Sequence, residues 1–518
     1  MKNKILTFLL LLIISYSCSE EKTVKYIPLT TDSQEAKEAF IEGVFRDDQN
    51  ETNESTAAFK KAMELDDNFL LAKIFYNSGI PSENRERLLK AFENRNQVSE
   101  IEKKIIEANY QMQVYGDSKA AISIFDSLII QNPDIPFLYE RTGNMKAFNS
   151  DFDKSIEYFN KALEIDPNSY FSALRLGLLH VQVGTEFQPL PEERRDLEEG
   201  KKWLEIASKI RPNASATPRF LGNIYRAELD LEKALEVYEL AVKKNTEKTS
   251  QLMEQNLMVG HTLMAMEKYD EAREAYQKTI DLSINNYWWG INRVYLSYTY
   301  LAEKKYDEAI RYLSEAQENL KNIEDAKEVI DWVDNRIEFN KWLVISHSQR
   351  KEEAMISMGR LNNRQFEDLQ IGLENAIDEK EKERLQRGYK VGTLFRSVWS
   401  DIVFGEYENA RLNLDEMNKI LKTRLNENPD ALNGYHALSG YLNLMEGNIE
   451  ESLKMYEKRK LRGDMGEYHD YFYALTLKAS GDVEKSEEIL LRIANSAFSD
   501  WTIAITKNLA KAQLQTNI

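Results

Sequence analysis

Residues 136–167 read P-F-L-Y-E-R-T-G-N-M-K-A-F-N-S-D-F-D-K-S-I-E-Y-F-N-K-A-L-E-I-D-P. Two runs with apolar residues at helical spacing flank a polar turn. In the second run Ser155, Phe159 and Ala162 lie four and three residues apart, so they share one face of a helix. In the first run Gly143 is small enough to let a second helix approach closely. The stretch therefore predicts two helices packed as a hairpin.

The same pattern recurs along the chain at a nearly regular interval. A polar turn, an apolar residue and two mostly charged residues precede a small residue at Ala121, Ser155, Ala234, Ala272, Ala309, Ala410, Ser452 and Ser486. The intervals from 121 to 155 and from 452 to 486 are both 34 residues. The pair Gly143 and Phe159 has equivalents in Gly222 with Tyr238, Gly260 with Tyr276 and Gly440 with Tyr456. One hairpin cannot bury this apolar face alone, so the pattern predicts a stacked array.

These residues resemble the tetratricopeptide repeat, a helix-turn-helix unit with small and aromatic residues at these positions and a closing proline. Pro167 occupies the closing position in the stretch quoted above. The resemblance implies an all-α solenoid of stacked helical hairpins. It also implies a protein or peptide ligand on the concave face. We expect an N-terminal array over residues 34–321 and a C-terminal array over residues 399–518.

Residues 322–398 keep helical periodicity but lack the recurring small residue. The interval from 309 to 410 is 101 residues, close to three repeat periods. We therefore expect an atypical helical segment or degenerate repeats, with a hinge between two arrays as the alternative. The charged run from Asp378 to Arg387 is typical of a solvated helix face.

The net charge and the cysteine content exclude several classes of function. The formal net charge is -18, and so acidic a surface repels nucleic acid, which we do not expect as a partner. Cys18 is the single cysteine, so the chain forms no internal disulfide and has no Cys-x-x-Cys metal motif.

The N-terminus has the features of a secretion signal. Lys2 and Lys4 precede the apolar run 5–14, which is too short to span a bilayer. The residues before Cys18 resemble the lipobox of a bacterial lipoprotein signal, although Ser15 and Tyr16 replace the usual leucine and small residue.

This resemblance implies that residues 1–17 are removed and that Cys18 carries the lipid. It implies an outer-membrane lipoprotein of a diderm bacterium, facing the periplasm or the cell surface. The acidic Ser19–Glu21 that follows resembles a surface-export signal. We expect residues 18–33 to be a flexible tether, with Asp32 and Glu35 capping the first helix. The alternative is an ordinary signal peptide cut near Ser17.

Motifs for catalysis, metal binding and cofactor binding are not found in the sequence. It contains no HExxH, GxSxG, Walker or GxGxxG pattern. His469 and Asp470 are consecutive, and consecutive residues on a helix point in different directions. We therefore expect no enzymatic activity, no catalytic residues, no metal and no cofactor.

Polar residues at first-helix positions form the first candidate binding surface. If the repeats follow the family, the concave wall includes Glu140, Asn144, Arg219, Asn223, Arg226, Glu254, His261, Val294 and Tyr298. Arg219, Asn223 and Arg226 share one helix face and could hold a peptide carboxylate through charge-assisted hydrogen bonds. The alternative is that they are ordinary exposed polar residues.

Tyr287, Trp288 and Trp289 form the second candidate surface, because they are the densest aromatic cluster in the chain. They could stack on a sugar or an extended peptide. The alternative is that they fill the seam between two hairpins.

Two functions are compatible with these features of the sequence. The first is a non-catalytic, lipid-anchored scaffold that binds protein or peptide partners. The second is a glycan-binding lipoprotein for nutrient capture, partnered with an outer-membrane transporter, since such lipoproteins combine a lipobox with helical hairpins.

Overall fold

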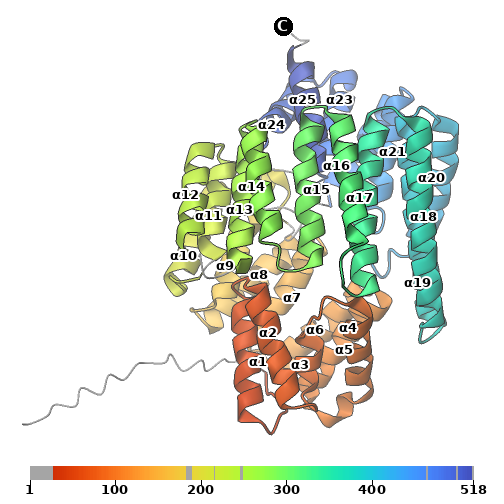
Figure 1. Cartoon of the computed structure of the whole chain (residues 1–518). Helices are drawn as coiled ribbons and strands as arrows, with labels where there is room; N and C mark the ends of the chain where they lie inside the picture. Colours follow the sequence, from red (N-terminus) through yellow and green to blue (C-terminus); the bar gives the residue numbers. More distant parts are fainter. Residues whose placement is uncertain are drawn as a thin grey trace, which may run out of the picture.

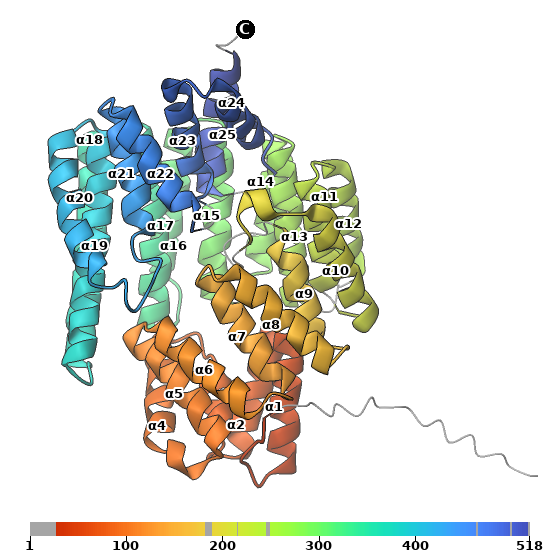
Figure 2. The same ribbon diagram turned by 180° about the vertical axis from the view of Figure 1, so that it is seen from behind.

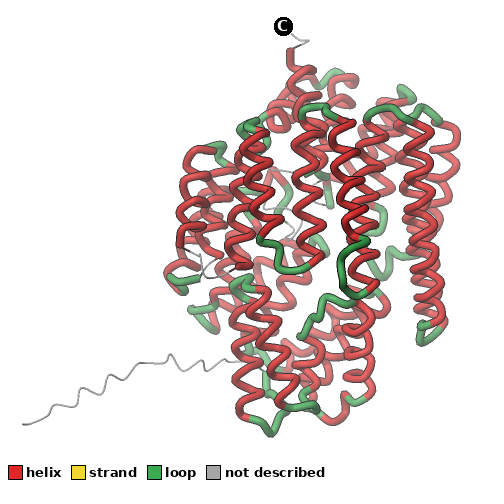
Figure 3. The backbone as a smooth tube through the Cα atoms, in the orientation of Figure 1, coloured by secondary structure: helices red, strands yellow, loops and turns green. Residues whose placement is uncertain are grey.

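The computed structural model describes residues 27–181, 189–214, 216–244, 249–462, 465–497 and 500–515. Within these ranges the backbone forms α-helices, two short 3-10 helices and no β-strand (Figure 3). In the same ranges no helix has the length and apolar character needed to cross a membrane. Cys18 and the signal predicted over residues 1–17 lie outside the described residues.

The N-terminal part of the chain contains eight α-helices, shown from red to yellow-orange in Figure 1. They are α1 (Gln34–Asp47), α2 (Thr52–Leu65), α3 (Leu70–Phe75), α4 (Pro81–Glu93), α5 (Glu100–Tyr115), α6 (Ser118–Gln131), α7 (Pro136–Phe148) and α8 (Phe152–Ile165). A 3-10 helix, Arg95–Gln97, lies between α4 and α5.

The middle part contains the next eight α-helices, which run side by side in Figures 1 and 2. They are α9 (Tyr170–Leu179), α10 (Leu197–Ile210), α11 (Ala216–Ala227), α12 (Leu231–Lys244), α13 (Thr249–Ala265), α14 (Tyr269–Asp281), α15 (Asn286–Ala302) and α16 (Tyr306–Leu320). The second 3-10 helix, Glu192–Arg194, precedes α10.

The C-terminal part begins with three long helices, and its last described helix follows the α23–α24 hairpin. Its members are α17 (Lys327–His347), α18 (Lys351–Glu374), α19 (Glu379–Val403), α20 (Tyr407–Lys422), α21 (Asn433–Met445), α22 (Ile449–Lys460), α23 (Glu467–Ser480), α24 (Val483–Ala494) and α25 (Trp501–Gln515). The predicted boundary between residues 398 and 399 falls inside α19.

The predicted role of the small residues is visible at each hairpin. A Cβ atom added to Gly143 would lie 3.0 Å from Cε1 of Phe159, and one added to Gly222 would lie 2.4 Å from Cε1 of Tyr238. Equivalent contacts join Gly260 to the ring of Tyr276, Gly440 to Tyr456 and Gly43 to Phe59. The glycine of the first helix therefore leaves the space that the aromatic ring of the second helix fills.

The turn inside each hairpin also repeats. In ten hairpins of the described residues, the residue five positions before the buried small residue has a positive φ, between 57° and 97°. Six of these turn positions are not glycine: Asn50, Ser150, Leu229, Glu267, Lys304 and Gln349. The other four are Gly116, Gly405, Gly447 and Gly481.

Two of these ten hairpins lack a counterpart in the recurring sequence pattern. The α1–α2 hairpin has Ser55, Phe59 and Ala62 on its buried face, with the same spacing as residues 155, 159 and 162. The α17–α18 hairpin has Gln349 at the turn and Ala354 as the buried small residue. The hairpin architecture therefore continues through residues 322–398 with longer helices.

The predicted tether is shorter than expected, and the helix cap differs by one residue. Ile27 is 4% exposed and packs in the core beside α1, and the amide of Thr30 donates to Oε1 of Glu102 at 2.8 Å. Burial of Ile27 thus fixes residues 27–33 against the array. Ser33, and not Asp32, caps α1, because its side chain accepts the amide hydrogen of Ala36.

The last helix, α25, joins two parts of the superhelix. Trp501 and Ile505 pack against the cores of both the middle and the C-terminal hairpins. Nδ2 of Asn508 donates to the carbonyl of Ala302 at 2.8 Å, and Nζ of Lys507 donates to the carbonyl of Ala265 at 2.9 Å. The array therefore curls until its end contacts its middle.

Candidate partner-binding surfaces

The first candidate surface, built on α11, is buried within the protein. Arg219 is 5% exposed and forms an ion pair with Glu254 of α13. Asn223 is 3% exposed and accepts a hydrogen bond from the hydroxyl of Tyr238. Arg226 is also 3% exposed. These side chains therefore do not form an open wall in this structure, and a binding role for them stays a prediction.

Asn144 lies in a different environment from these three residues. It is half-buried on α7 and lines a cavity of about 10 Å³ with Phe148 and Arg175. A cavity of this volume has room for one water molecule at most.

The turn between α1 and α2 covers the edge of the array beside this wall. Asp48 of the turn is 4% exposed, and its Oδ1 lies 3.0 Å from Nη2 of Arg141 in α7. Arg211, which ends α10, donates to the carbonyl of Phe45 at 3.3 Å, and its guanidinium lies 4.2 Å from the Phe45 ring centroid. Nε2 of Gln251 in α13 donates to the carbonyl of Asn50 at 3.2 Å. The turn thus bonds to residues of three different hairpins.

A buried carboxyl group marks this contact. Glu140 is 7% exposed and accepts a hydrogen bond from the hydroxyl of Ser169 at 2.6 Å. Burial and the neighbouring charge of Asp48 raise the pKa of Glu140 to about 7, and burial also raises the pKa of Asp48. Protonation of Glu140 near neutral pH would therefore remove the repulsion between its carboxylate and that of Asp48.

The second candidate surface is partly exposed. Tyr287, in the first turn of α15, is 42% exposed and stacks on Trp332 of α17, which is 37% exposed, with ring centroids 4.4 Å apart. Trp288 is half-buried and meets Tyr287 edge to face at 5.5 Å. The two helices thus present neighbouring aromatic faces to solvent.

Trp289 serves the core instead. Its ring packs against the hydrophobic cluster of the middle hairpins, and the guanidinium of Arg293 lies 4.1 Å from its centroid. Tyr287 is thus exposed enough to contact a ligand, whereas Trp289 fills the seam between hairpins. The neighbours differ because consecutive residues on a helix point in different directions.

Sequence reasoning missed two residues of these surfaces. Trp332 is distant from residues 287–289 in the chain, and only the α15–α17 packing brings it onto Tyr287. Arg211 was not singled out, although it precedes Pro212 at the end of a repeat helix. The helical spacing of residues 329 to 337 could have indicated that Trp332 lies away from the core face of α17, which carries Val333 and Ile337.

The titratable groups of the described residues form no metal-type cluster of three or more His, Cys, Asp or Glu side chains. Burial lowers the pKa of His347 and of His469 to about 4, so both are neutral at physiological pH. His261 is buried and its Nδ1 lies 2.8 Å from the hydroxyl of Tyr276.

Comparison with known proteins supports the repeat assignment. A family model described as tetratricopeptide repeat matches residues 138–169 and 256–285. Mouse (Mus musculus) protein O-mannosyl-transferase TMTC3 is 25% identical over 196 residues, which are 35% of this chain and 20% of the transferase. Anaphase-promoting complex subunit 3 of Schizosaccharomyces pombe is 26% identical over 123 residues, 24% of this chain and 17% of the subunit. The chain thus spans a fifth or less of the length of these relatives.

Two solved structures are also similar. The crystal structure of the apo form of RapI aligns with a TM-score of 0.34 at 12% identity, covering 61% of this chain and 99% of RapI. The human IFIT1 dimer with PPP-AAAA aligns with a TM-score of 0.33 at 14% identity, covering 81% of this chain and 88% of IFIT1.

The matched residues 138–169 lie in α7 and α8, whose Gly143–Phe159 contact defines the hairpin, and residues 256–285 hold the equivalent Gly260–Tyr276 contact. The chain thus contains tetratricopeptide repeats at these two stretches, within an all-α solenoid of stacked helical hairpins.

Proposed function

We propose that this protein is a non-catalytic scaffold, attached to the outer membrane of a diderm bacterium through a lipid on Cys18, that binds a protein or peptide partner. The observation that carries the proposal is the exposed Tyr287–Trp332 stack on an array of tetratricopeptide hairpins. Similar arrays are used widely to present extended binding surfaces.

The aromatic stack is suited to contact with another chain. Tyrosine and tryptophan provide large contact areas and a polar group at one end, and they are enriched among the residues that dominate binding energy. Two such rings at 42% and 37% exposure leave apolar area in water. Covering that area with a partner is favourable by about 25 cal/mol per Å² buried.

Affinity capture of crosslinked partners from the native envelope tests the binding surface. The variant Tyr287→Ala/Trp332→Ala should lose the partner that the wild-type protein captures. Leu412→Ala is the matched control, because Leu412 is 71% exposed on α20, away from this surface. Retention of the same partner by the double variant would contradict the proposal.

Membrane fractionation tests the anchor separately. Two or three acyl chains on one residue hold a protein stably on a bilayer, and removing the attachment point removes them all. Cys18→Ala should therefore move the protein from the membrane to the soluble fraction. If this variant stays in the membrane fraction, the lipid anchor is disproved while the scaffold proposal stands.

Glycan binding is the second candidate, and the surroundings of the stack favour it. Nδ2 of Asn286 donates to Oδ2 of Asp325 at 2.7 Å, so an amide and a carboxylate group lie at the N-terminus of α15, the helix end that carries Tyr287. Sugar rings use such polar groups for hydrogen bonds while they stack on aromatic faces. Isothermal titration with a broad oligosaccharide panel distinguishes the two: saturable binding that Trp332→Ala abolishes would favour the glycan function.

TMTC3 is named as a transferase, but the region similar to this chain is one fifth of that protein. We propose no transferase activity for this chain.

A further inference from the structure

Two parts of the solenoid that are distant in sequence meet along a seam. We define the first jaw as α1–α8, residues 34–165, and the second jaw as α17–α22, residues 327–460. The helices α9–α16 connect the jaws. In Figure 1 the orange helices α4 and α5 lie next to the lower ends of α17 and α19, and α5 contacts α19 directly.

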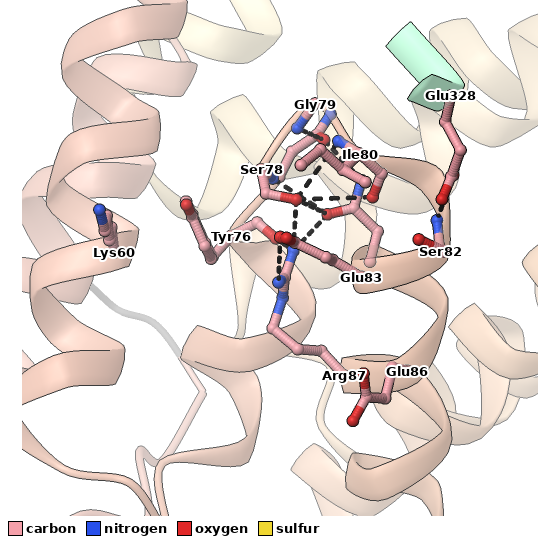
Figure 4. Close-up of polar contacts among 12 residues, drawn as sticks. Lys60, Tyr76, Ser78, Gly79, Ile80, Ser82, Glu83, Glu86, Arg87 and Glu328 are labelled. Atoms are coloured by element: carbon pink, nitrogen blue, oxygen red, sulfur yellow. Dashed lines mark hydrogen bonds and ion pairs between the residues drawn. The ribbon is translucent and has the colours of Figure 1, made fainter. Parts of the chain in front are cut away.

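The first seam contact is made at the N-terminus of α4. The amide of Ser82 donates to Oε2 of Glu328, in the first turn of α17, at 2.9 Å (Figure 4). Arg87 holds the preceding loop in place, because its Nη2 donates to the carbonyl of Tyr76 at 3.3 Å and to Oγ of Ser78 at 3.2 Å. A carboxylate from the second jaw thus pairs with a helix-end amide of the first.

The second contact joins α4 and α5 to the turn between α18 and α19. Nη2 of Arg85 lies 2.7 Å from Oε2 of Glu381 and 3.3 Å from the carbonyl of Asn375. The hydroxyl of Tyr115 donates to Oδ2 of Asp378 at 2.6 Å. The ammonium of Lys380 lies 4.1 Å from the centroid of the Tyr115 ring.

The third contact lies at the turn between α7 and α8. Oγ of Ser150 donates to the carbonyl of Arg462 at 3.0 Å and lies 3.2 Å from Oδ2 of Asp430. Nε of Arg462 donates to Oδ1 of the same Asp430 at 2.6 Å. Ser150 therefore contacts the side chain of Asp430 and the main chain of Arg462, two residues whose side chains already pair within the C-terminal part.

The hydrophobic cores do not cross the seam. The cluster of the first jaw draws its buried members from residues 27 to 162, and the main cluster of the second jaw draws its members from residues 342 to 468. Among the described residues, no buried cluster combines members of the two jaws. In the part of the chain that the structure describes, the seam is thus held by hydrogen bonds, the Arg85–Glu381 ion pair and the Lys380–Tyr115 cation–π contact.

We propose that the solenoid is a clamp whose jaws close through this polar seam and open without unfolding of either jaw. Separating the jaws exposes charged and polar groups that water can solvate, whereas separating two halves of a hydrophobic core exposes apolar area. Apart from the bonds of α10 and α13 to the α1–α2 turn and of α13 and α15 to α25, the connecting helices pack on their neighbours in the chain, so small rotations at the remaining interfaces add up to a displacement at the seam. This device is independent of the identity of any partner.

Distance measurement between two spin labels tests the clamp. In full-length protein with Cys18→Ser, labels at Glu86→Cys on α4 and Glu383→Cys on α19 report the seam, and both native side chains lie at the protein surface. The seam variant is Arg85→Ala/Tyr115→Phe. The matched control is Lys104→Ala, which removes an ion pair with Glu107 inside α5 and leaves the seam intact.

Double electron–electron resonance should give one short distance for the wild type and for the control at 0.1 M salt. The seam variant should gain a second, longer component with unchanged helical content by circular dichroism. The wild type should gain the same component at 1 M salt, where the screening length falls from about 10 Å to about 3 Å. A single short distance under all conditions would overturn the clamp, as would a longer distance that appears only with loss of helical content.

Discussion

Replacement of Gly222 by alanine tests whether the two helices of a hairpin pack closely because the glycine leaves room for the aromatic ring. The new Cβ atom would lie 2.4, 2.7 and 2.9 Å from three carbon atoms of the Tyr238 ring. Carbon atoms pack at about 3.5–4.0 Å, so the ring or the helix must move by about 1 Å. The ring has little freedom to move, because Tyr238 is fully buried and its hydroxyl donates to Asn223.

The expected magnitude is the difference of two opposing effects. Alanine in a helix is favoured over glycine by about 0.5–1 kcal/mol. Overpacking a core costs about 1–3 kcal/mol. Because the new contact would be as short as 2.4 Å, we take the upper part of this overpacking range, about 2–3 kcal/mol, and expect Gly222→Ala to destabilise the array by about 1–2.5 kcal/mol net. Gly359→Ala on α18 is the matched control, because its Cβ would have no neighbour within 4 Å, and it should stabilise by about 0.5–1 kcal/mol.

Native-state hydrogen exchange measures both effects, because a long repeat array does not unfold in one step. The amides of α11 and α12 should exchange faster in Gly222→Ala than in the wild type, while Gly359→Ala should slow exchange in α18. The shortest ring contacts of Gly260, Gly440 and Gly143 are 2.6, 2.8 and 3.0 Å, so their alanine variants should be progressively milder. A neutral or stabilising Gly222→Ala would refute the role assigned to the glycine.

Four further substitutions test the roles assigned to individual side chains and turn residues. Arg219→Ala leaves the buried carboxylate of Glu254 without its arginine and should destabilise by about 3–5 kcal/mol in urea unfolding, whereas retained stability with lost partner capture would show that the wall is a binding site. Burial raises the pKa of Glu140 from 4.5 to about 7, so its proton contributes stability that is complete below about pH 4.5 and is lost as the pH rises through 7. Glu140→Gln should remove that loss of stability. The urea midpoint of the variant, measured from acidic to mildly alkaline pH, should therefore increase relative to that of the wild type as the pH rises. Leu229→Gly should stabilise by about 0.5–1 kcal/mol, since Leu229 has φ 63° and is 47% exposed, and Gly405→Ala at the equivalent turn should do the opposite in the same thermal melt.

The local architecture could be predicted because each hairpin obeys rules that operate within one repeat. The spacing of Ser155, Phe159 and Ala162 predicted a shared helix face, and all three are buried in α8. The α1–α2 hairpin carries the same spacing at Ser55 and Phe59 and lies within the predicted N-terminal array, but it was not singled out as a repeat, because its turn at Asn50 precedes a run without the usual apolar residue. Two residues after the turn residue with positive φ, the α1–α2 hairpin has the polar Thr52, whereas the α7–α8 hairpin has the apolar Phe152.

The candidate site could not be predicted to the same degree, because exposure depends on contacts between distant repeats. Arg219 and Arg226 lie on one helix face as expected, yet burial on that face is decided by α13, which supplies Glu254. The Tyr287–Trp332 stack likewise needs the packing of α17 on α15. No pattern within a repeat specifies how far the superhelix curls.

The curl itself connects the buried wall to the polar seam. Each hairpin interface adds a small rotation, and over the described array these rotations bring the α1–α2 turn against α7, α10 and α13 and bring α25 against α15. The inner positions that would hold a peptide in a more open array are thereby filled by the chain's own side chains. A partner of the closed form therefore meets side chains that stay exposed in it, such as Tyr287 and Trp332. Because the seam contacts are polar, opening of the jaws would enlarge the accessible surface, so seam variants that open should bind any inner-face ligand more tightly than the closed wild type.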